Sequence, residues 1–454
     1  MKNYKHKRKF KMSVPRIIIA GFLLIIMSGT ILLSLPISSA DHTFTDVGTA
    51  MFTSLSATCV TGLTIKDTGT YWSVFGEIVI LIMVQIGGIG FMSVAVLVSM
   101  AIKRSITPRE RNVISQSFGL NTNEGILKFV RKILLGTLLI EFVGACVLST
   151  QFIPQFGVSD GIYRSVFHSV SAFCNSGFDI MGNVSGEFTN FVSYRYNNVV
   201  CVTLMILVIL GGIGFAVWDD VINMIVRRKR FTAYTKLVLV ITAVLIVTGA
   251  VLVLLFEYSN PQTIAGDSLP DKIMAATFHS VMARTAGFTT IDNGLFTEST
   301  VAISILLMFI GGASGSTAGG VKVATFGILV AAVLQISAGK NEIVIFRRTV
   351  SKTTVLKAMT VVVFAIILIL VSTFLIVTFD NIGFMLALYE SASAVTTAGI
   401  TMSLTATLST ASHILLMIMM FLGRIGILTF TYSISTYTAN TSVITYPETY
   451  MPVG

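Results

Sequence analysis

The stretch FTSLSATCVTGL, residues 52–63, recurs along the chain and decides its fold. It returns as FHSVSAFCNSGF at 167–178, as YESASAVTTAGI at 389–400 and, with one residue deleted, as FHSVMARTAGF at 278–288. Each copy starts with an aromatic residue and ends with a glycine that a large apolar residue follows. The glycines are 115, 110 and 112 residues apart, at Gly62, Gly177, Gly287 and Gly399. Copies at one regular spacing predict four structural repeats that together account for nearly the whole chain.

The composition places these repeats in a membrane. Of the 454 residues, 54% are hydrophobic and only 11% are charged, whereas soluble domains carry about 25% charged residues. Apolar runs of about 20 residues can span a bilayer as helices. Eight such runs are predicted to span, at 16–37, 74–102, 133–153, 199–226, 237–256, 300–335, 355–379 and 411–433. Shorter half-apolar stretches lie within the pairs, at 46–58, 160–173, 271–283 and 384–396.

The basic residues give the predicted orientation. The net charge is +10, and 24 of the 31 Lys and Arg residues lie in alternate connections, namely the N-terminus through Arg16 and the segments 103–132, 227–236 and 340–357. An excess of Lys and Arg marks the cytoplasmic side of a membrane protein. We therefore expect a multi-pass protein of the cell membrane with both termini in the cytoplasm. The positive charge is a topology signal, so no nucleic-acid partner is expected.

A second glycine motif completes each repeat. It reads QIGGIGF at 85–91, LGGIGF at 210–215, IGGASG at 310–315 and LGRIGI at 422–427. Each repeat is therefore predicted to be a spanning helix, a short half-buried helix, a loop ending in glycine, and a second spanning helix with the glycine pair inside it. Asp46, Asp160 and Asp271 are expected N-caps of the short helices, and Asp380 and Asn381 stand at that place in the fourth. The predicted units are a basic N-terminus, 1–13, and repeats 14–104, 127–230, 236–338 and 353–440.

The loops that end the short helices are predicted to form a selectivity filter around a central pore. Backbone that leaves a helix inside a membrane must be buried in protein or line a water-filled cavity. Glycine permits positive φ, which lets successive carbonyls face one axis, and carbonyl rings can replace the hydration shell of an ion. Carboxylates are absent from these loops, which suits a monovalent cation. The predicted filter loops, which would hold potassium, comprise Thr58, Cys59, Val60, Thr61, Gly62, Cys174, Asn175, Ser176, Gly177, Thr285, Ala286, Gly287, Thr396, Thr397, Ala398 and Gly399.

Three polar side chains on or beside the filter need separate predictions. Arg284 is expected to turn behind its loop and pair with an acid, the alternative being that it lines the pore. His168 and His279 occupy one position in two repeats. That recurrence favours packing or hydrogen bonding over a metal site.

The segment GGASGSTAGG, residues 311–320, interrupts the run 300–335. It comprises Gly311, Gly312, Ala313, Ser314, Gly315, Ser316, Thr317, Ala318, Gly319 and Gly320. Glycine costs about 1 kcal/mol relative to alanine inside a helix, so the helix is predicted to break here. We interpret the break as a gate loop across the cavity below the filter, followed by Lys322. The alternative is a packing face made of glycines four residues apart.

Arg424 replaces the second glycine of the fourth motif, in the middle of an apolar helix. Ionisable side chains inside a membrane cost at least about 2.5 kcal/mol and are functional candidates. It is expected to face the cavity beside the gate. The alternative is an arginine that snorkels to the interface or is paired for structural reasons.

The four glycine-ended short helices and the segment GGASGSTAGG, with Lys322 after it, resemble the Trk/Ktr/HKT superfamily of potassium transporters. With its short basic N-terminus the chain is most similar to the bacterial Ktr-type membrane subunit. The four copies in one chain predict an all-α membrane protein with fourfold pseudosymmetry around a central pore. The resemblance implies a homodimer with one pore per subunit, and control by a cytosolic ring of nucleotide-binding RCK subunits. It also implies sodium-stimulated uptake. In plant relatives a serine at the first filter glycine accompanies sodium selectivity, so four glycines favour potassium.

Other function classes fit less well. An alternating-access sodium/potassium symporter is the second candidate, but such folds usually contain inverted repeats, and units of two spans all share one orientation. An enzyme is not expected, because the chain has no HExxH, GxSxG or phosphate-loop motif. No covalent cofactor is expected. We expect potassium to be the transported ion and sodium to be a second ion. A nucleotide is expected to act only through the partner subunit.

Overall fold

The computed structural model describes residues 14–90, 111 and 125–426. Four long helices start the repeats: α1 (Val14–Ser34), α7 (Ile126–Phe156), α12 (Ala233–Glu257) and α16 (Lys352–Asp380). All four are long and apolar enough to cross a bilayer. Their outer faces expose large apolar side chains, such as Leu24 and Phe142. Such faces suit contact with lipid rather than water.

Each long helix is followed by a short helix on its inner side, as the sequence predicts. The four short helices are α2 (Val47–Cys59), α8 (Val158–Phe173), α13 (Leu269–Met282) and α17 (Phe384–Thr396). Each short helix contacts the long helix of its own repeat and the second helix of the preceding repeat. Thus α8 touches α4 (Val74–Ile89), α13 touches α10 (Asn198–Gly212), α17 touches α14 (Glu298–Phe309) and α2 touches α18 (Thr410–Ile425). The last pair joins the fourth repeat to the first. These contacts link the short helices and the second helices of the four repeats into a closed ring, which is consistent with the predicted fourfold arrangement.

The N-caps follow the prediction in the first repeat only. Asp46 caps α2 by accepting a hydrogen bond from Thr49 N at 3.2 Å. The expectation is wrong elsewhere, because Gly157 precedes α8, Ser268 caps α13 and Gly383 precedes α17. Asp160 and Asp271 fall instead in the first helical turn, where a negative charge still stabilises the helix dipole.

The second helices of the repeats end at their glycine motifs: α4 (Val74–Ile89), α10 (Asn198–Gly212), α14 (Glu298–Phe309) and α18 (Thr410–Ile425). Gly90, Gly214 and Gly426 have φ of 87°, 90° and 86°, a conformation that glycine adopts without steric cost. The prediction of one continuous span at 199–226 is therefore wrong. The chain bends by 96° into α11 (Phe215–Arg227). The ends of the predicted runs 74–102 and 411–433 lie outside the described residues.

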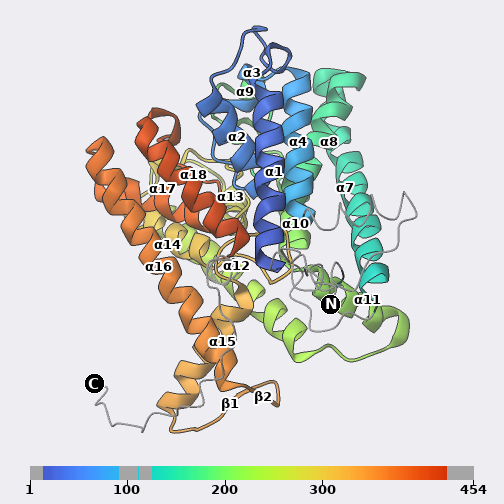
Figure 1. The fold of residues 1–454 in the computed structure, drawn as a ribbon, viewed down its shortest axis with the longest axis vertical. Coiled ribbons are helices and arrows are strands. Elements are labelled where there is room, and N and C mark those ends of the chain that lie inside the picture. The colour runs from blue at the N-terminus through green and yellow to red at the C-terminus, as the bar shows by residue number, and fades with distance from the viewer. Residues whose placement is uncertain (1–13, 91–110, 112–124, 427–454) are drawn as a thin grey trace, which may run out of the picture.

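The predicted break in the third repeat is present. α14 ends at Phe309 and α15 begins only at Val323 and runs to Ser337. After α15 the chain forms an antiparallel hairpin that the sequence did not predict, β1 (Ile343–Ile345) and β2 (Arg348–Val350), with Val344 opposite Thr349. Figure 1 shows this hairpin at the end of the molecule opposite to α3 (Thr68–Tyr71) and α9 (Gly182–Ser185), with α11 at the side of the same half as the hairpin. Short turns complete the fold: α3 (Thr68–Tyr71), α9 (Gly182–Ser185), η1 (Pro36–Ser38), η2 (Val192–Tyr194), η3 (Asn293–Leu295) and η4 (Thr405–Thr407).

Candidate functional site

The four filter loops share one backbone conformation. The residue two before each glycine is left-handed, with φ of 58° at Val60, 58° at Asn175, 70° at Thr285 and 51° at Thr397. The glycines themselves have φ of 89° at Gly62, 72° at Gly177, 81° at Gly287 and 79° at Gly399. Left-handed backbone costs about 1–2 kcal/mol at a residue with a Cβ. Four repeats of the same strained conformation mark a functional feature.

The four glycines meet one another in a closed ring. A Cβ built on Gly62 would overlap the carbonyl oxygen of Ser176. One on Gly177 would lie 2.9 Å from Ala286 O, and one on Gly287 would lie 3.4 Å from Ala398 O. One on Gly399 would overlap Thr61 O. Each glycine thus faces the carbonyl that precedes the glycine of the next repeat, and the fourth returns to the first.

This ring presents backbone oxygen and no charge. The short helices α2, α8, α13 and α17 all end there, so their C-terminal dipole ends, about −0.5 charge each, converge on it. The hydroxyl oxygens of Thr61, Thr285 and Thr397 are buried and have no hydrogen-bond partner within the described ranges. The arrangement favours a cation and offers it uncharged oxygen ligands.

A vestibule opens on one side of the ring. This cavity of about 430 Å³ is lined by all four filter glycines. Four acids also line it, namely Asp67, Asp179, Glu187 and Asp292, and its described lining contains no Lys or Arg. Burial raises the pKa of the Asp179 carboxyl to about 7, and the nearby Asp67 charge adds to the rise. Clefts lined by one sign of charge concentrate ions of the opposite sign.

The non-helical segment 310–322 lies against the other side of the ring. A Cβ on Gly319 would come 2.5 Å from Thr396 O in the fourth filter loop. The loop also pairs with the second repeat, where Ala313 N donates to Gly212 O at 2.9 Å and Phe215 N donates to Gly315 O at 3.0 Å. Since this segment is not helical, the alternative of a helix-packing glycine face is wrong.

Three cationic side chains donate hydrogen bonds to carbonyls of loop 310–322. Arg284 Nη2 reaches Gly311 O at 3.1 Å, Arg424 Nη1 reaches Thr317 O at 2.6 Å, and Lys322 Nζ reaches Ala318 O at 2.7 Å. The expected pairing of Arg284 with an acid is wrong. Its guanidinium is buried and forms no ion pair in the part of the chain that the structure describes. A broken helix leaves carbonyls without partners, and these cations satisfy some of them.

The sequence reasoning missed Glu390. This residue is fully buried on α17 and accepts hydrogen bonds from the hydroxyls of Thr401 and Thr405, the latter at 2.9 Å. Thr401 follows the fourth filter glycine by two residues, so Glu390 fixes the chain where it leaves the filter. The sequence contained a signal for this role, because Glu390 occupies the same position in the fourth repeat as His168 and His279 occupy in the second and third.

Both histidines form hydrogen bonds, as predicted. His168 Nε2 accepts from Ile180 N at 3.1 Å, and His279 Nε2 lies 2.7 Å from Ser304 Oγ. Ile180 follows the second filter glycine by three residues, so His168 has the same kind of role as Glu390. This repeat position therefore supports the filter from behind in more than one repeat.

Comparison with known proteins places this geometry in one family. Residues 2–440 match the family model TrkH, described as cation transport protein. The chain is 39% identical over 435 residues to the Ktr system potassium uptake protein B of Bacillus subtilis, covering 96% of this chain and 95% of that protein. It is 34% identical to the potassium/sodium uptake protein NtpJ of Enterococcus hirae, covering 95% and 94% of the two chains.

The structural comparison supports the same fold. The crystal structure of the potassium transporter TrkH from Vibrio parahaemolyticus matches with a TM-score of 0.70 at 17% identity, covering 96% of this chain and 87% of that chain. With apolar helices long enough to span a bilayer and a closed ring of glycine loops, the protein is a membrane protein. The chain belongs to the TrkH family of cation transport proteins.

Proposed function

We propose that this protein takes up potassium through a pore at the axis of the four filter loops. The observation that carries the proposal is the closed ring in which each filter glycine faces a carbonyl of the next repeat. Uncharged oxygens suit a monovalent ion that must also leave the site. A membrane potential of 100 mV contributes about 2.3 kcal/mol per charge, enough for about fiftyfold accumulation without ATP.

Potassium is the favoured ion because no filter glycine is replaced. A side chain at any of these positions would push against the backbone of a neighbouring filter loop, and the coordination of the ion depends on the carbonyls of that backbone. Two relatives support the choice of ion by name, since one is a potassium uptake protein and another a potassium/sodium uptake protein. We propose that sodium stimulates uptake or enters as a second ion.

Loop 310–322 is the proposed gate. It lies directly beneath the ring and carries Lys322, while Arg284 and Arg424 approach it from two other segments. The guanidinium charges of Arg284 and Arg424, with that of Lys322 when it is protonated, have no acidic partner among the described residues and would repel a cation that leaves the filter. Movement of this loop together with its cations would open the path.

The acid-lined vestibule would be the extracellular entrance, with both termini in the cytoplasm of a cell-membrane protein. The basic residues support this orientation, because Arg227, Arg228, Lys229 and Arg230 are exposed at the end of α11, away from α3 and α9 in Figure 1. We propose that the basic segments 103–132 and 227–236 dock a cytosolic ring of RCK-type nucleotide-binding subunits. The proposed assembly is a homodimer on this ring.

Complementation tests the transport function. The full chain is expressed in cells that lack their own potassium uptake systems, and growth is measured at limiting potassium. Restored growth is expected. A matched chain with Gly62→Ser and Gly399→Ser should be inserted equally and fail to restore it. Equal rescue by both chains would show that transport does not use this ring.

Gentle purification tests the assembly. The tagged chain is isolated from its native membrane, and the mass of the complex and its nucleotide content are measured. A complex with a soluble partner is expected, and it should be lost when Arg227, Arg228, Lys229 and Arg230 are all changed to Ser. Recovery of this chain alone from the unaltered protein would reject the docking proposal.

A further inference from the structure

One filter loop makes a side-chain hydrogen bond to the proposed gate. The left-handed position two residues before the glycine is Val60, Asn175, Thr285 or Thr397 in the four repeats. Val60 has no polar side-chain atom, and the hydroxyls of Thr285 and Thr397 have no partner in the described ranges. Thr397 packs against Gly319, but among these four residues only Asn175 makes a side-chain hydrogen bond to loop 310–322 in the described ranges, and its partner is Thr317.

The network around Asn175 fixes its amide group. With its nitrogen toward the loop, the two N–H groups of the Asn175 amide have three acceptors within reach, namely Thr317 Oγ1 at 3.0 Å, Phe173 O at 3.2 Å and Val208 O at 3.3 Å. An oxygen in that place would face the Phe173 and Val208 carbonyls, which are acceptors only. Thr317 Oγ1 in turn donates to Phe173 O at 3.1 Å. Asn175 and Thr317 are 2% and 0% exposed, so neither group can exchange its partner for bulk water.

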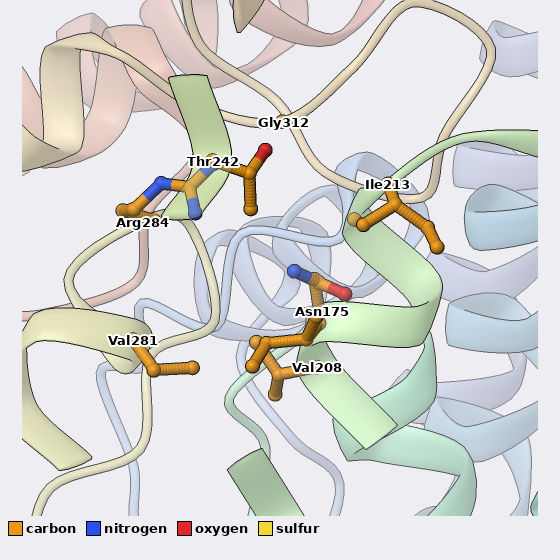
Figure 2. A pocket seen from close by; sticks show the side chains of 9 residues that line it. Asn175, Val208, Ile213, Thr242, Val281, Arg284 and Gly312 are labelled. Atoms are coloured by element: carbon orange, nitrogen blue, oxygen red, sulfur yellow. The ribbon is translucent and has the colours of Figure 1, made fainter. Parts of the chain in front are cut away.

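A small cavity lies beside this network. It measures about 10 Å³ and is lined by Asn175, Arg284 and Gly312, among others, which is about the space of one water molecule. Figure 2 shows the Asn175 amide and the Arg284 guanidinium on two sides of this space. Arg284 precedes the third filter loop and donates to Gly311 O in loop 310–322. Asn175 of the second filter loop and Arg284 next to the third are thus both bonded to the proposed gate.

We infer that Asn175 makes the ion selectivity of the filter depend on the position of loop 310–322. The inference rests on the proposed gate and extends it. When the loop moves away, Thr317 leaves and the Asn175 amide loses one of its three acceptors. The backbone at Asn175 is left-handed, with φ of 58°, so it returns to a commoner conformation once its support weakens. The carbonyl of Ser176, which faces Gly62, then shifts with it.

The test uses the full chain in proteoliposomes and measures initial uptake of potassium and of sodium separately. Thr317→Val removes the hydroxyl with little change in shape, and it should lower the potassium-to-sodium uptake ratio by about two- to tenfold, the range expected for one hydrogen bond. Thr317→Ser keeps the hydroxyl and should keep the ratio. Thr203→Val serves as the matched control, because Thr203 is half-buried on α10, far from loop 310–322 in the sequence, and its hydroxyl donates to Val199 O of its own helix.

A double-variant cycle tests whether the two residues act together. Asn175→Thr introduces the residue that repeats three and four carry at this position, so the backbone should be tolerated. It should lower the ratio as Thr317→Val does, and the double variant should be no worse than either single one. An unchanged ratio in Thr317→Val, or effects that add in the double variant, would overturn the inference.

Deletion of Ala313–Ala318 separates this inference from the gate proposal. The gate proposal and the inference about Asn175 are both supported if the deletion raises potassium flux and lowers the potassium-to-sodium uptake ratio. Unchanged or reduced flux in a well-folded deletion variant rejects the gate itself. Raised flux with the ratio of the unaltered protein rejects only the link between gate and selectivity.

Discussion

Arg424 Nη1 donates a hydrogen bond of 2.6 Å to the carbonyl oxygen of Thr317, which joins the end of α18 to the middle of loop 310–322. The other terminal nitrogen of the same guanidinium donates to Gly88 O at 3.4 Å and also to Gly87 O. One side chain of the fourth repeat therefore connects the first repeat with the broken segment of the third. If loop 310–322 is the gate, Arg424 holds it in the closed position.

Arg424→Ala should raise potassium flux. Hydrogen bonds to charged groups contribute about 1.5–3 kcal/mol, so their loss should raise the open fraction by about tenfold or more. Deletion of Ala313–Ala318 should act in the same direction, and the two changes should not add, because they remove the same contact. Flux in proteoliposomes, normalised to folded protein, measures both. Lys357→Ala, at an exposed site on α16, is the control for loss of a positive charge, and reduced flux in well-folded Arg424→Ala would contradict the prediction.

Serine at the filter glycines should weaken the preference for potassium over sodium, with an order that the ring predicts. Gly62→Ser and Gly399→Ser place a Cβ on top of a neighbouring carbonyl oxygen, whereas the Cβ of Gly287→Ser lies 3.4 Å from one. The first two should therefore lose the most selectivity, and all four carry the added cost of a Cβ at positive φ. Competitive uptake of the two ions gives the order. Unaltered preference in all four variants would refute the filter assignment.

The acids of the vestibule should speed the capture of cations at low ionic strength. Glu187→Gln and Asp292→Asn remove exposed charges that line the cavity, and Asn can still cap Gly294 N as Asp292 does. Together they should raise the half-saturating potassium concentration by about two- to fivefold at low salt. The difference should vanish near 1 M choline chloride, where the Debye length is about 3 Å. A difference that persists at high salt would indicate a direct contact with the ion instead.

Uptake should fall as the pH in the vestibule drops through the pKa of Asp179, which burial raises to about 7. A raised carboxyl pKa means that the negative charge is present at pH 8 and is lost by pH 6, so the vestibule attracts cations less at the lower pH. Potassium uptake at subsaturating concentration measures the effect. Asp179→Asn should flatten this pH profile, and an unchanged profile in the variant would assign the dependence to another group.

Glu390→Ala should destabilise the protein and broaden its ion selectivity. The substitution leaves the hydroxyls of Thr401 and Thr405 without their acceptor, at a cost of about 1–3 kcal/mol for each buried group. Glu390→Gln keeps one oxygen acceptor and should lie between Ala and the unaltered protein. Thermal unfolding in detergent and the potassium-to-sodium uptake ratio are the measurements. Selectivity equal to that of the unaltered protein in both variants would show that Glu390 supports the helix and not the filter.

The repeats could be predicted from the sequence because their backbone conformation requires particular residue types, above all glycine. Gly62 and its three counterparts require positive φ, and their even spacing predicted both the short helices and their number. The break after Phe309 was predictable for the same reason, since five glycines in ten residues cannot continue a helix. These features depend on local conformation, which a single sequence carries.

The bend at Gly214 could not be predicted, because apolar residues continue on both sides of it. At this bend Phe215 N donates to Gly315 O of the third repeat, and a contact between such distant segments leaves no signal in the local sequence. The partner of Arg284 was hidden in the same way. An acid was expected for its charge, whereas the broken helix supplies a carbonyl from a segment 27 residues further along the chain.

The closure of the ring from Gly399 back to Thr61 has a consequence for how such a pore can specialise. A pore made of four identical subunits must repeat every feature four times, so a barrier on one side appears on all sides. Here the four walls belong to one chain and have become unlike. The third repeat carries the broken helix, the fourth carries Arg424, which donates a hydrogen bond to it, and the second carries Asn175, which bonds to Thr317 within it. If loop 310–322 is the gate, this difference between the repeats would let one segment control the pathway while the other three repeats keep their arrangement.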